Sequence, residues 1–421
     1  MITTKRLKIS VSLIIFIVIL ANNICFANID DDEVIDINEI KKETIEAVSK
    51  NTEELKLNSK IGLIFDRNSK TILYEKNGLK QVPMASTTKI MTAIVVLENA
   101  NLDDIVTISK KAAGTGGSRL GLKTNDKITV HDLLYGLMLK SGNDAAVALA
   151  EHVGGGIDGF AELMNKKASE MGLVNSHFVT PHGLDQEKHY TTAYELACMA
   201  DYALNIPKFR EIVGSKKYNI TINARSSLIG NTNELLGNLY GVYGVKTGFT
   251  NGAGRCLVTA CKRDDIDIIT VVLSANTKKE RTLDSVKLIE YANKNYDVIN
   301  IEEKIKEKFN NWKQLNEKRI YINKAKTQNI NLQIEDLKYS KMAVNKKDID
   351  KINIEINSLY YLEAPVYENQ IIGNVKVKIG DETIAILNIY NKELIHKKDI
   401  FDYFIDFLSF VPWLLNKNLL L

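Results

Sequence analysis

Apolar residues follow strand-like and then helix-like spacings along the first part of the chain. Two short apolar runs around an Asp-Arg-Asn-Ser turn, within residues 60–77, predict a β-hairpin. From Ser86 to Ala100 the apolar residues recur at helical spacing, and residues 132–153 hold two more helical segments separated by Ser-Gly-Asn. Further helices are predicted over Gly159–Met171 and Thr192–Leu204.

Strand-like residues return near position 243. Two apolar runs flank a Phe-Thr-Asn-Gly-Ala-Gly turn, a third strand is predicted over Ile266–Ser274, and a helix follows through Tyr296. Strands at both ends of a region, with helices between them, predict one sheet built from both ends and covered by a helical cluster. We therefore predict an α+β domain over residues 28–298.

The composition changes after about residue 300. Lysine, isoleucine and asparagine dominate, and the short strands of residues 299–396 predict a small β-rich domain. Residues 397–421 differ again, because nearly everything between their regularly spaced polar residues is large and apolar. These polar residues recur every three or four positions: Asp399, Asp402, Asp406 and Ser409. The pattern predicts an amphipathic helix with one narrow polar stripe.

The first residues have the pattern of a secretory signal peptide. Lys5, Arg6 and Lys8 precede the apolar run Leu13–Ala21, and a plausible cleavage end follows at residue 27. This pattern predicts that residues 1–27 are removed and that the protein works outside the cytoplasm. The three basic residues account for the whole formal net charge of +3, so the remaining chain is formally neutral and nucleic acid is not a predicted partner.

The cysteines and histidines indicate neither a disulfide framework nor a metal centre. Beyond the leader, Cys256 and Cys261 lie five residues apart in a strand-like run, on opposite faces, and Cys198 is left over. There is no Cys-x-x-Cys motif, and the six histidines are scattered. We therefore predict buried free thiols and no cofactor or metal.

Ser86 and Lys89 are the first candidates for chemistry. Ser86 is the only serine followed by a lysine three residues later. On a helix the two side chains share a face, and a serine that opens a helix lies near unpaired backbone N–H groups. Lys89 accepts a proton near neutral pH only if burial or a nearby cation lowers its pKa. The pair is therefore either exposed helix surface or a nucleophile with its base.

The motif Lys246-Thr247-Gly248 occurs once, at the end of a predicted strand. If this strand faces the helix, Lys246 would keep Lys89 neutral by repulsion and would attract an anionic group. Thr247 would offer a hydroxyl to that anion, and Gly248 would let a substrate backbone lie close to the strand. The alternative is an ordinary junction between a strand and a turn.

The motif Ser141-Gly142-Asn143 separates two predicted helices. The hydroxyl of Ser141 can relay a proton, and the amide of Asn143 can hold a carbonyl or amide of a substrate. The alternative is a helix end followed by an N-cap. The pattern alone is weak, because Ser274-Ala275-Asn276 matches it at a predicted strand end.

Together and in this order, the three motifs form the set found in class A β-lactamases and penicillin-binding proteins. The chain resembles the low-molecular-mass penicillin-binding proteins, the serine-type D-Ala-D-Ala carboxypeptidases. The segments L-L-Y-G-L-M-L-K-S-G-N, T-P-H-G-L-D and A-P-V-Y-E-N-Q extend the resemblance over essentially the whole mature chain. It implies a transpeptidase-like domain with an antiparallel sheet and a helical cluster, followed by the small β-rich domain.

The resemblance also implies a reaction. The penultimate D-alanine of a peptidoglycan stem peptide acylates the serine, the last D-alanine leaves, and water hydrolyses the acyl-enzyme. Ser86 would be the nucleophile and Lys89 its base, and Ser141 would relay the proton to the leaving amine. The implied partners are stem peptides that end in D-Ala-D-Ala and the β-lactam antibiotics that imitate them.

The same resemblance assigns substrate-binding roles. Asn143 would hold the peptide, and Lys246 and Thr247 would bind its terminal carboxylate. The backbone N–H groups of the nucleophile and of Phe249 would form the oxyanion hole. Arg255 lies across the predicted hairpin and is either a second cation for the carboxylate or an exposed strand residue. His182, in T-P-H-G-L-D, is predicted to be hydrogen-bonded loop structure rather than a catalyst.

The apolar tail is predicted to attach the protein to the outer face of the cytoplasmic membrane. An aspartate at every turn argues against a spanning helix, whereas Trp413 and the leucines suit a helix that lies in the interface. Because the stripe is acidic, attachment would depend on apolar area rather than on attraction to anionic lipid. A helix that mediates oligomerisation is the alternative.

Two other functions stay open at this point. A β-lactamase shares the motifs, but the Ser-Gly-Asn motif, the β-rich domain and the tail argue against it. A penicillin-binding protein that has lost turnover could serve as a scaffold, and the intact motif residues argue against that reading.

Overall fold

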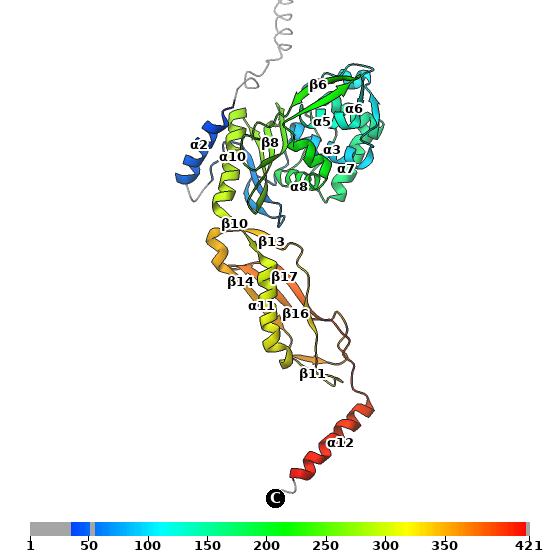
Figure 1. Ribbon diagram of the computed structural model, residues 1–421, viewed down its shortest axis with the longest axis vertical. Coiled ribbons are helices and arrows are strands. Elements are labelled where there is room, and N and C mark those ends of the chain that lie inside the picture. Colours follow the sequence, from blue (N-terminus) through cyan, green and yellow to red (C-terminus); the bar gives the residue numbers. More distant parts are fainter. Residues whose placement is uncertain (1–34, 51–54, 418–421) are drawn as a thin grey trace, which may run out of the picture. The chain divides into compact units, whose positions relative to one another are not determined.

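The computed structural model describes residues 35–50 and 55–417 (Figure 1). The predicted signal peptide lies outside the described residues. The chain divides into two compact units. The first holds the described residues up to Ile64, then Tyr74–Cys261 and Ile269–Glu290; the second holds Phe65–Leu73, Lys262–Ile268 and the chain from Tyr291 onward.

A five-stranded sheet is built from both ends of the predicted α+β domain. Its strand order is β2 (Ile72–Lys76), β1 (Ile61–Asp66), β9 (Ile266–Ala275), β8 (Gly254–Arg263) and β7 (Val242–Thr250). β7 and β8 pair antiparallel across the predicted hairpin, and β7 forms an edge of the sheet. β1 is buried along its whole length, in agreement with its continuous apolar run. The predicted α+β class is confirmed.

Helix α3 (Lys89–Asn99) is the centre of the helical cluster. Every residue from Lys89 to Val96 is buried, as expected for a helix that is apolar on all sides. The helices that contact it are α5 (Val130–Met138), α6 (Asn143–Gly154), α7 (Ile157–Glu170), α8 (Ala193–Leu204) and α9 (Pro207–Gly214). The first unit also contains α2 (Ile37–Lys50), α4 (Lys110–Ala113) and the part of α10 (Lys278–Asn295) up to Glu290. Its other elements are the strand pairs β3 (Ile105–Thr107) with β4 (Lys127–Thr129) and β5 (Lys217–Ile222) with β6 (Arg225–Gly230).

Ser86 does not open an α-helix, contrary to the expectation of one helix from Ser86 to Ala100. It lies in a 3₁₀ turn, η2 (Ala85–Thr88), and α3 starts at Lys89. The hydroxyls of Thr87 and Thr88 donate to the carbonyls three residues earlier, at 2.5 and 2.8 Å. Such bonds satisfy the tighter i to i+3 turn locally.

The second unit is β-rich, as predicted, but it also contains a helix that the sequence reading missed. Its main sheet has the order β12 (Leu332–Ile334), β17 (Glu382–Asn391), β16 (Ile371–Ile379) and β14 (Ile352–Ser358). Helix α11 (Ile301–Asn316) adds Ile301, Ile305 and Phe309, spaced four residues apart, to its core. The remaining elements are β10 (Tyr296–Asn300) with β13 (Lys341–Asn345), β11 (Tyr321–Asn323) with β15 (Tyr361–Glu363), η3 (Glu317–Arg319) and η4 (Lys346–Lys351).

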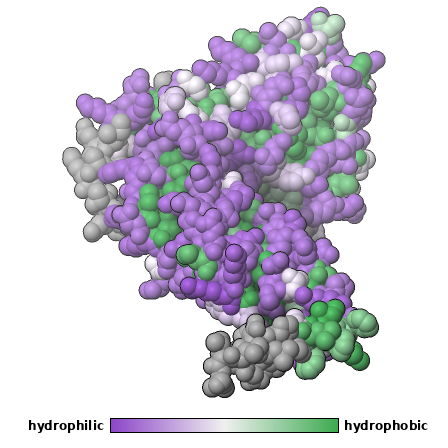
Figure 2. Space-filling model, turned by 60° about the horizontal axis from the view of Figure 1, so that its bottom comes forward, coloured by the Kyte–Doolittle hydropathy of each residue, from purple (hydrophilic) through white to green (hydrophobic). Residues whose placement is uncertain are grey.

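The chain ends in helix α12 (Ile400–Lys417). Large apolar side chains in its described part are exposed, among them Ile400 at 87% and Phe401 at 75% (Figure 2). Within residues 35–50 and 55–417, no helix combines the length and the apolarity that a membrane crossing requires.

Gly183 tests how tightly the T-P-H-G-L-D loop packs on η2. Its φ is +85°, and a Cβ there would lie 1.9 Å from the carbonyl oxygen of Ala85. We expect Gly183→Ala to lower the free energy of unfolding by about 3 kcal/mol, because backbone atoms cannot yield as side chains do. Denaturant unfolding measures the change.

Gly172→Ala is the matched control. Gly172 has a similar φ of +72°, but nothing lies within 4 Å of a Cβ there. Gly172→Ala should lower the free energy of unfolding by only about 1 kcal/mol, from the backbone conformation alone. Equal effects in the two variants would contradict the packing argument.

Candidate active site

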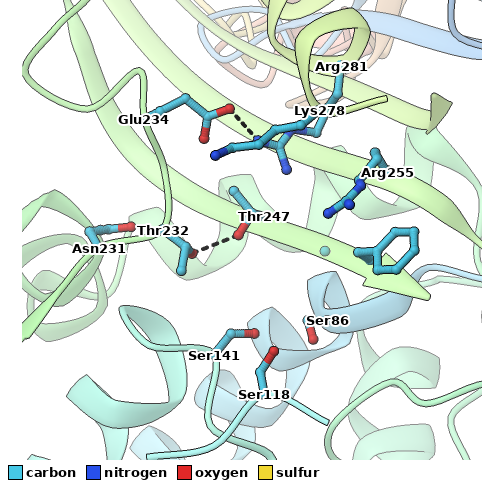
Figure 3. Close-up of a pocket in the computed structure, with 12 residues that line it drawn as sticks. Ser86, Ser118, Ser141, Asn231, Thr232, Glu234, Thr247, Arg255, Lys278 and Arg281 are labelled. Carbon is cyan, nitrogen blue, oxygen red and sulfur yellow. Dashed lines mark hydrogen bonds and ion pairs between the residues drawn. The ribbon is translucent and has the colours of Figure 1, made fainter. Parts of the chain in front are cut away.

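A pocket of about 490 Å³ lies where η2, the turn between α5 and α6, and strand β7 meet (Figure 3). The side chains of Ser86 and Ser141 enter it from one side, and Thr247 faces them from β7 (Figure 3). The full lining is Ser86, Ser118, Ser141, Asn231, Thr232, Glu234, Thr247, Gly248, Phe249, Arg255, Lys278 and Arg281. The three motifs, far apart in sequence, therefore meet at one cavity.

Lys89 lies directly behind Ser86 and is fully buried. Its Nζ is 2.8 Å from Ser86 Oγ, 2.7 Å from Asn143 Oδ1 and 3.0 Å from the carbonyl oxygen of His182. Burial, and secondly the charge of Lys246, lower the pKa of Lys89 well below its usual value, and Asp144 opposes the shift. A neutral amine at hydrogen-bond distance from a serine hydroxyl can take its proton.

Lys246 is the second buried lysine, at 1% exposure on β7. Its Nζ donates to the carbonyl oxygen of Thr247 at 2.8 Å. Burial and then the charge of Arg281 lower its pKa to about 7. The repulsion expected between Lys246 and Lys89 is present, although burial is the larger cause of the shift in Lys89.

Gly248 permits a close approach of β7 to η2. A Cβ at this position would lie 3.1 Å from the backbone nitrogen of Ser86 and 3.2 Å from that of Thr87. A larger residue would push the strand away from Ser86. Phe249 follows on the pocket wall, so Phe249 and Ser86 line the same cavity.

The two polar residues of Ser141-Gly142-Asn143 have different positions. Ser141 has a φ of +61° and lies on the pocket wall. Asn143 is the first residue of α6 and is 2% exposed. Besides accepting from Lys89, its amide donates to the carbonyl oxygen of Gly116 at 2.7 Å. Asn143 thus lies behind the lining and links Lys89 to the loop that carries Ser118.

Asp144, which the sequence reading did not single out, holds that loop. Its fully buried carboxylate accepts from the backbone nitrogens of Leu120, Gly121 and Leu122, at 2.8, 2.8 and 3.1 Å. Three such bonds fix the backbone of this loop relative to the carboxylate. The loop is therefore anchored on the N-terminal turn of the helix that positions Asn143.

Arg255 lines the pocket and is 3% exposed, so it is not an exposed strand residue. It lies opposite Phe249 in the pairing of β7 with β8, and its guanidinium carbon is 3.9 Å from the centre of the Phe249 ring. The stacking orients one cation beside Thr247, whose hydroxyl lies 2.7 Å from that of Thr232.

A second arginine, Arg281 of α10, was missed by the sequence reading. It forms an ion pair with Glu234, which also accepts from Thr282, and both members of the pair line the pocket (Figure 3). Lys278, one helical turn earlier, lines it too. The only local signal is the three-residue spacing of Lys278 and Arg281, which places two cations on one helix face.

The T-P-H-G-L-D segment packs against η2 and Lys89. The backbone of His182 accepts from Lys89, and its ring Nδ1 accepts from the Leu184 nitrogen at 3.1 Å. Burial and the charge of Lys89 lower the pKa of His182 to about 3. Asp185 accepts from Thr250 at 2.6 Å and from the Gly252 nitrogen at 2.9 Å, and so fixes the turn between β7 and β8. These contacts agree with the predicted loop-shaping role.

None of the three free thiols in the described residues lines the pocket. Cys198, Cys256 and Cys261 form no disulfide, and the last two are buried. In the part of the chain that the structure describes, no three His, Cys, Asp or Glu residues group together as metal ligands would.

Comparison with known proteins decides the family. Residues 47–277 match the D-alanyl-D-alanine carboxypeptidase family, and residues 309–397 match the C-terminal domain of penicillin-binding protein 5. The chain belongs to the D-alanyl-D-alanine carboxypeptidase family. This confirms the resemblance drawn from the motifs.

Individual members of the carboxypeptidase family match over different lengths. D-alanyl-D-alanine carboxypeptidase DacF of Bacillus subtilis is 37% identical over 254 residues, which are 59% of this chain and 65%, just under two thirds, of that protein. DacA of Haemophilus influenzae is 31% identical over 338 residues, or 78% of this chain and 82% of that one. The crystal structure of penicillin binding protein 5 from Haemophilus influenzae superimposes with a TM-score of 0.69 at 28% identity, covering 82% of this chain and 100% of that one.

Glu234→Gln tests the ion pair at the far side of the pocket. The change keeps the side-chain shape but leaves the buried guanidinium of Arg281 without its anion. We expect the free energy of unfolding to fall by about 3 kcal/mol, because an uncompensated buried charge is costly. Denaturant unfolding measures the loss.

Glu280→Gln provides the comparison from the same helix. Glu280 lies in the first turn of α10 and accepts only a 3.2 Å bond from the Asn276 nitrogen among the contacts described. Glu280→Gln should lower the free energy of unfolding by less than about 1 kcal/mol. A loss at Glu234 no larger than this would mean that Arg281 does not depend on its partner.

Proposed function

We propose that the protein is a serine-type D-Ala-D-Ala carboxypeptidase, which removes the terminal D-alanine from peptidoglycan stem peptides through an acyl-enzyme on Ser86. The observation that carries this proposal is the contact between Ser86 Oγ and the buried amine of Lys89, at the base of a pocket with cationic walls. Membership of the carboxypeptidase family supports it.

Acylation begins at Ser86. Its Oγ bonds to the carbonyl carbon of the penultimate D-alanine while its proton passes to Lys89 Nζ. The negative charge that develops on the carbonyl oxygen is stabilised by the backbone N–H groups of Ser86 and Phe249. The C–N bond then breaks, the proton reaches the leaving nitrogen through Ser141, and D-alanine departs with Lys89 neutral again.

Recognition depends on the terminal carboxylate. Thr247 offers it a hydroxyl, and Lys246, Arg255 and Arg281 supply positive charge around it. Asn143 holds Lys89 and the Ser118 loop, and through them the peptide between η2 and the edge strand β7. The free edge of β7 suits an extended peptide that adds to the sheet.

Hydrolysis of the ester repeats the chemistry with water as the nucleophile. Water loses a proton, its oxygen bonds to the acyl carbon, and the bond to Ser86 Oγ breaks as the serine regains a proton. A β-lactam would acylate Ser86 in the same way. Because its opened ring stays attached to the acyl group, it cannot depart as D-alanine does.

We further propose that residues 1–27 direct secretion, that the catalytic domain covers residues 28–298 and that the β-rich domain covers residues 299–396. The tail, residues 397–421, would hold the protein at the outer face of the cytoplasmic membrane. The exposed apolar side chains of α12 support this attachment.

Two assays test the proposed reaction. The parent protein should release D-alanine from a D-Ala-D-Ala peptide and, in intact mass spectrometry, should gain the mass of one benzylpenicillin. Ser86→Ala should lose both, with release falling at least about 10³-fold, because no other group occupies the position of its Oγ.

The combination of results separates the three functions considered. An adduct without release of D-alanine would leave a penicillin-binding scaffold, and rapid loss of the adduct with destruction of the drug would indicate a β-lactamase. Thr87→Ala, in the same turn, is the control for folding, since its hydroxyl donates to the Met84 carbonyl and lies outside the pocket lining.

The pH dependence tests the charges of the two lysines. The active form needs neutral Lys89 and charged Lys246, whose pKa is about 7. kcat/KM should therefore fall on the acid side as Lys89 gains a proton, and on the alkaline side as Lys246 loses one near pH 7. Arg281→Gln should move the alkaline limb to higher pH, because removal of a neighbouring positive charge raises the pKa of Lys246.

The same variant should lower the maximum of kcat/KM roughly 10- to 100-fold, through loss of one charged contact to the carboxylate. Lys278→Gln is the matched control: it removes a cation from the same pocket that does not contribute to the shift of Lys246. An alkaline limb that stays in place in Arg281→Gln, or moves equally in Lys278→Gln, would contradict the assignment of this limb to Lys246.

A further inference from the structure

Exposed aromatic and apolar residues gather at one end of the second unit. We call Tyr321, Leu359, Tyr360 and Tyr361 the tyrosine end. Their exposures are 54, 56, 46 and 59%, respectively. Large side chains this exposed, together at one place, are typical of a surface that contacts something else.

The pairing of β11 with β15 creates this surface. The two short strands run parallel, with Tyr321 opposite Tyr361, and their ring centres lie 5.9 Å apart. Ile322 and Leu362, the next residues along each strand, are buried in the core of the unit. Because side chains alternate between the faces of a strand, burial of these two residues forces both tyrosines outward.

Helix α12 begins at the same end of the second unit. The Lys398 nitrogen donates to the Lys324 carbonyl oxygen at 2.7 Å, and Lys326 Nζ lies 2.9 Å from carboxylate oxygens of both Asp399 and Asp402. The start of α12 is therefore joined by direct contacts to Lys324 and Lys326, in the segment that follows β11 and its Tyr321. Figure 1 shows β11 and the start of α12 at this end of the second unit.

The charges at this end are largely paired with one another. Lys324 pairs with Glu363 at 2.8 Å, Lys326 with the two aspartates, and Lys398 with Asp406. Paired charges attract little counter-charge from a partner. What remains is the exposed apolar and phenol surface of these residues. Tyrosine and tryptophan provide this combination at the headgroup level of bilayers.

We propose that the tyrosine end is a second membrane-contact surface, which lies in the headgroup layer of a bilayer while α12 lies in the interface. The inference rests on the proposed attachment through α12. The headgroup layer is about 5–8 Å deep on each side of the hydrocarbon. Tyr321 and Tyr361 lie on the paired strands β11 and β15, and the segment after β11 contacts the start of α12, so the proposal places both tyrosines in this layer. Zwitterionic lipid should suffice because the contact is apolar.

A tryptophan reporter tests this contact. In the mature chain from Asn28 onward, both natural tryptophans are replaced, as Trp312→Phe and Trp413→Phe, and Tyr361→Trp adds the reporter. With phosphatidylcholine vesicles, emission should move to shorter wavelength, and brominated phosphatidylcholine should quench it. Tyr240→Trp, in the first unit and 74% exposed, is the matched control and should not respond.

Flotation of the same samples with the vesicles separates this inference from the attachment itself. Flotation, together with a fluorescence response of the Tyr361→Trp reporter and none of the Tyr240→Trp control, supports the proposal. Flotation without that response overturns it while the anchor stands, and failure to float overturns both. A response that needs only a higher protein concentration, and no vesicles, also overturns it and identifies a second copy of the chain as the occupant.

Paired substitutions measure the contribution of the surface. Tyr321→Ser with Tyr361→Ser should weaken partitioning into phosphatidylcholine vesicles by on the order of tenfold, since partitioning scales with buried apolar area. Tyr321→Phe with Tyr361→Phe should retain it. Unfolding curves that match the parent's are required of both variants, and equal partitioning of the serine pair and the parent would contradict the proposal.

Discussion

The contact between the Lys89 amine and Ser86 exists only because a lysine is buried inside the central helix of a domain. A buried ammonium is costly unless it is neutralised or surrounded by acceptors. Here the nitrogen has three oxygen partners, from η2, from α6 and from the T-P-H-G-L-D loop. Each of these elements must be in place for the amine to be tolerated, so the fold around α3 and the contact between Lys89 and Ser86 depend on the same elements.

The pocket concentrates charges that oppose one another. Lys89 and Lys246 are both buried and repel, and Arg281 acts in the same direction on Lys246. Such an arrangement lowers stability, as is common where chemistry needs a perturbed pKa. Two carboxylates limit the effect: Asp144 holds the Ser118 loop on α6, and Glu234 holds Arg281 on the pocket wall.

The edge position of β7 links the sheet to the reaction. Since β7 is the last strand of its sheet, one side of its backbone is not used by a neighbouring strand. Gly248 brings that strand to within contact distance of the Ser86 backbone nitrogen. The same edge can therefore receive an extended peptide and present backbone donors to its carbonyl. The edge position of β7 and the absence of a side chain at Gly248 together make this possible.

Local sequence patterns determined much of this protein. The spacing of apolar residues predicted the sheet, most helices of the first unit and the β-rich second domain. The three motifs singled out Ser86, Lys89, Ser141 and Lys246 as candidates and indicated the family. These features depend on neighbours within a few residues, where the periods of helix and strand apply.

Only the tertiary structure decided the remaining features. Ser86 lies in a 3₁₀ turn, Asn143 lies behind the pocket, and Arg255 stacks on Phe249 inside it. Arg281 and Glu234, 47 residues apart, carry no shared motif and meet through the packing of α10. Likewise, Tyr321 and Tyr361 became neighbours only when β11 and β15 paired. Contacts between distant segments depend on how whole elements pack, and no local period encodes that packing.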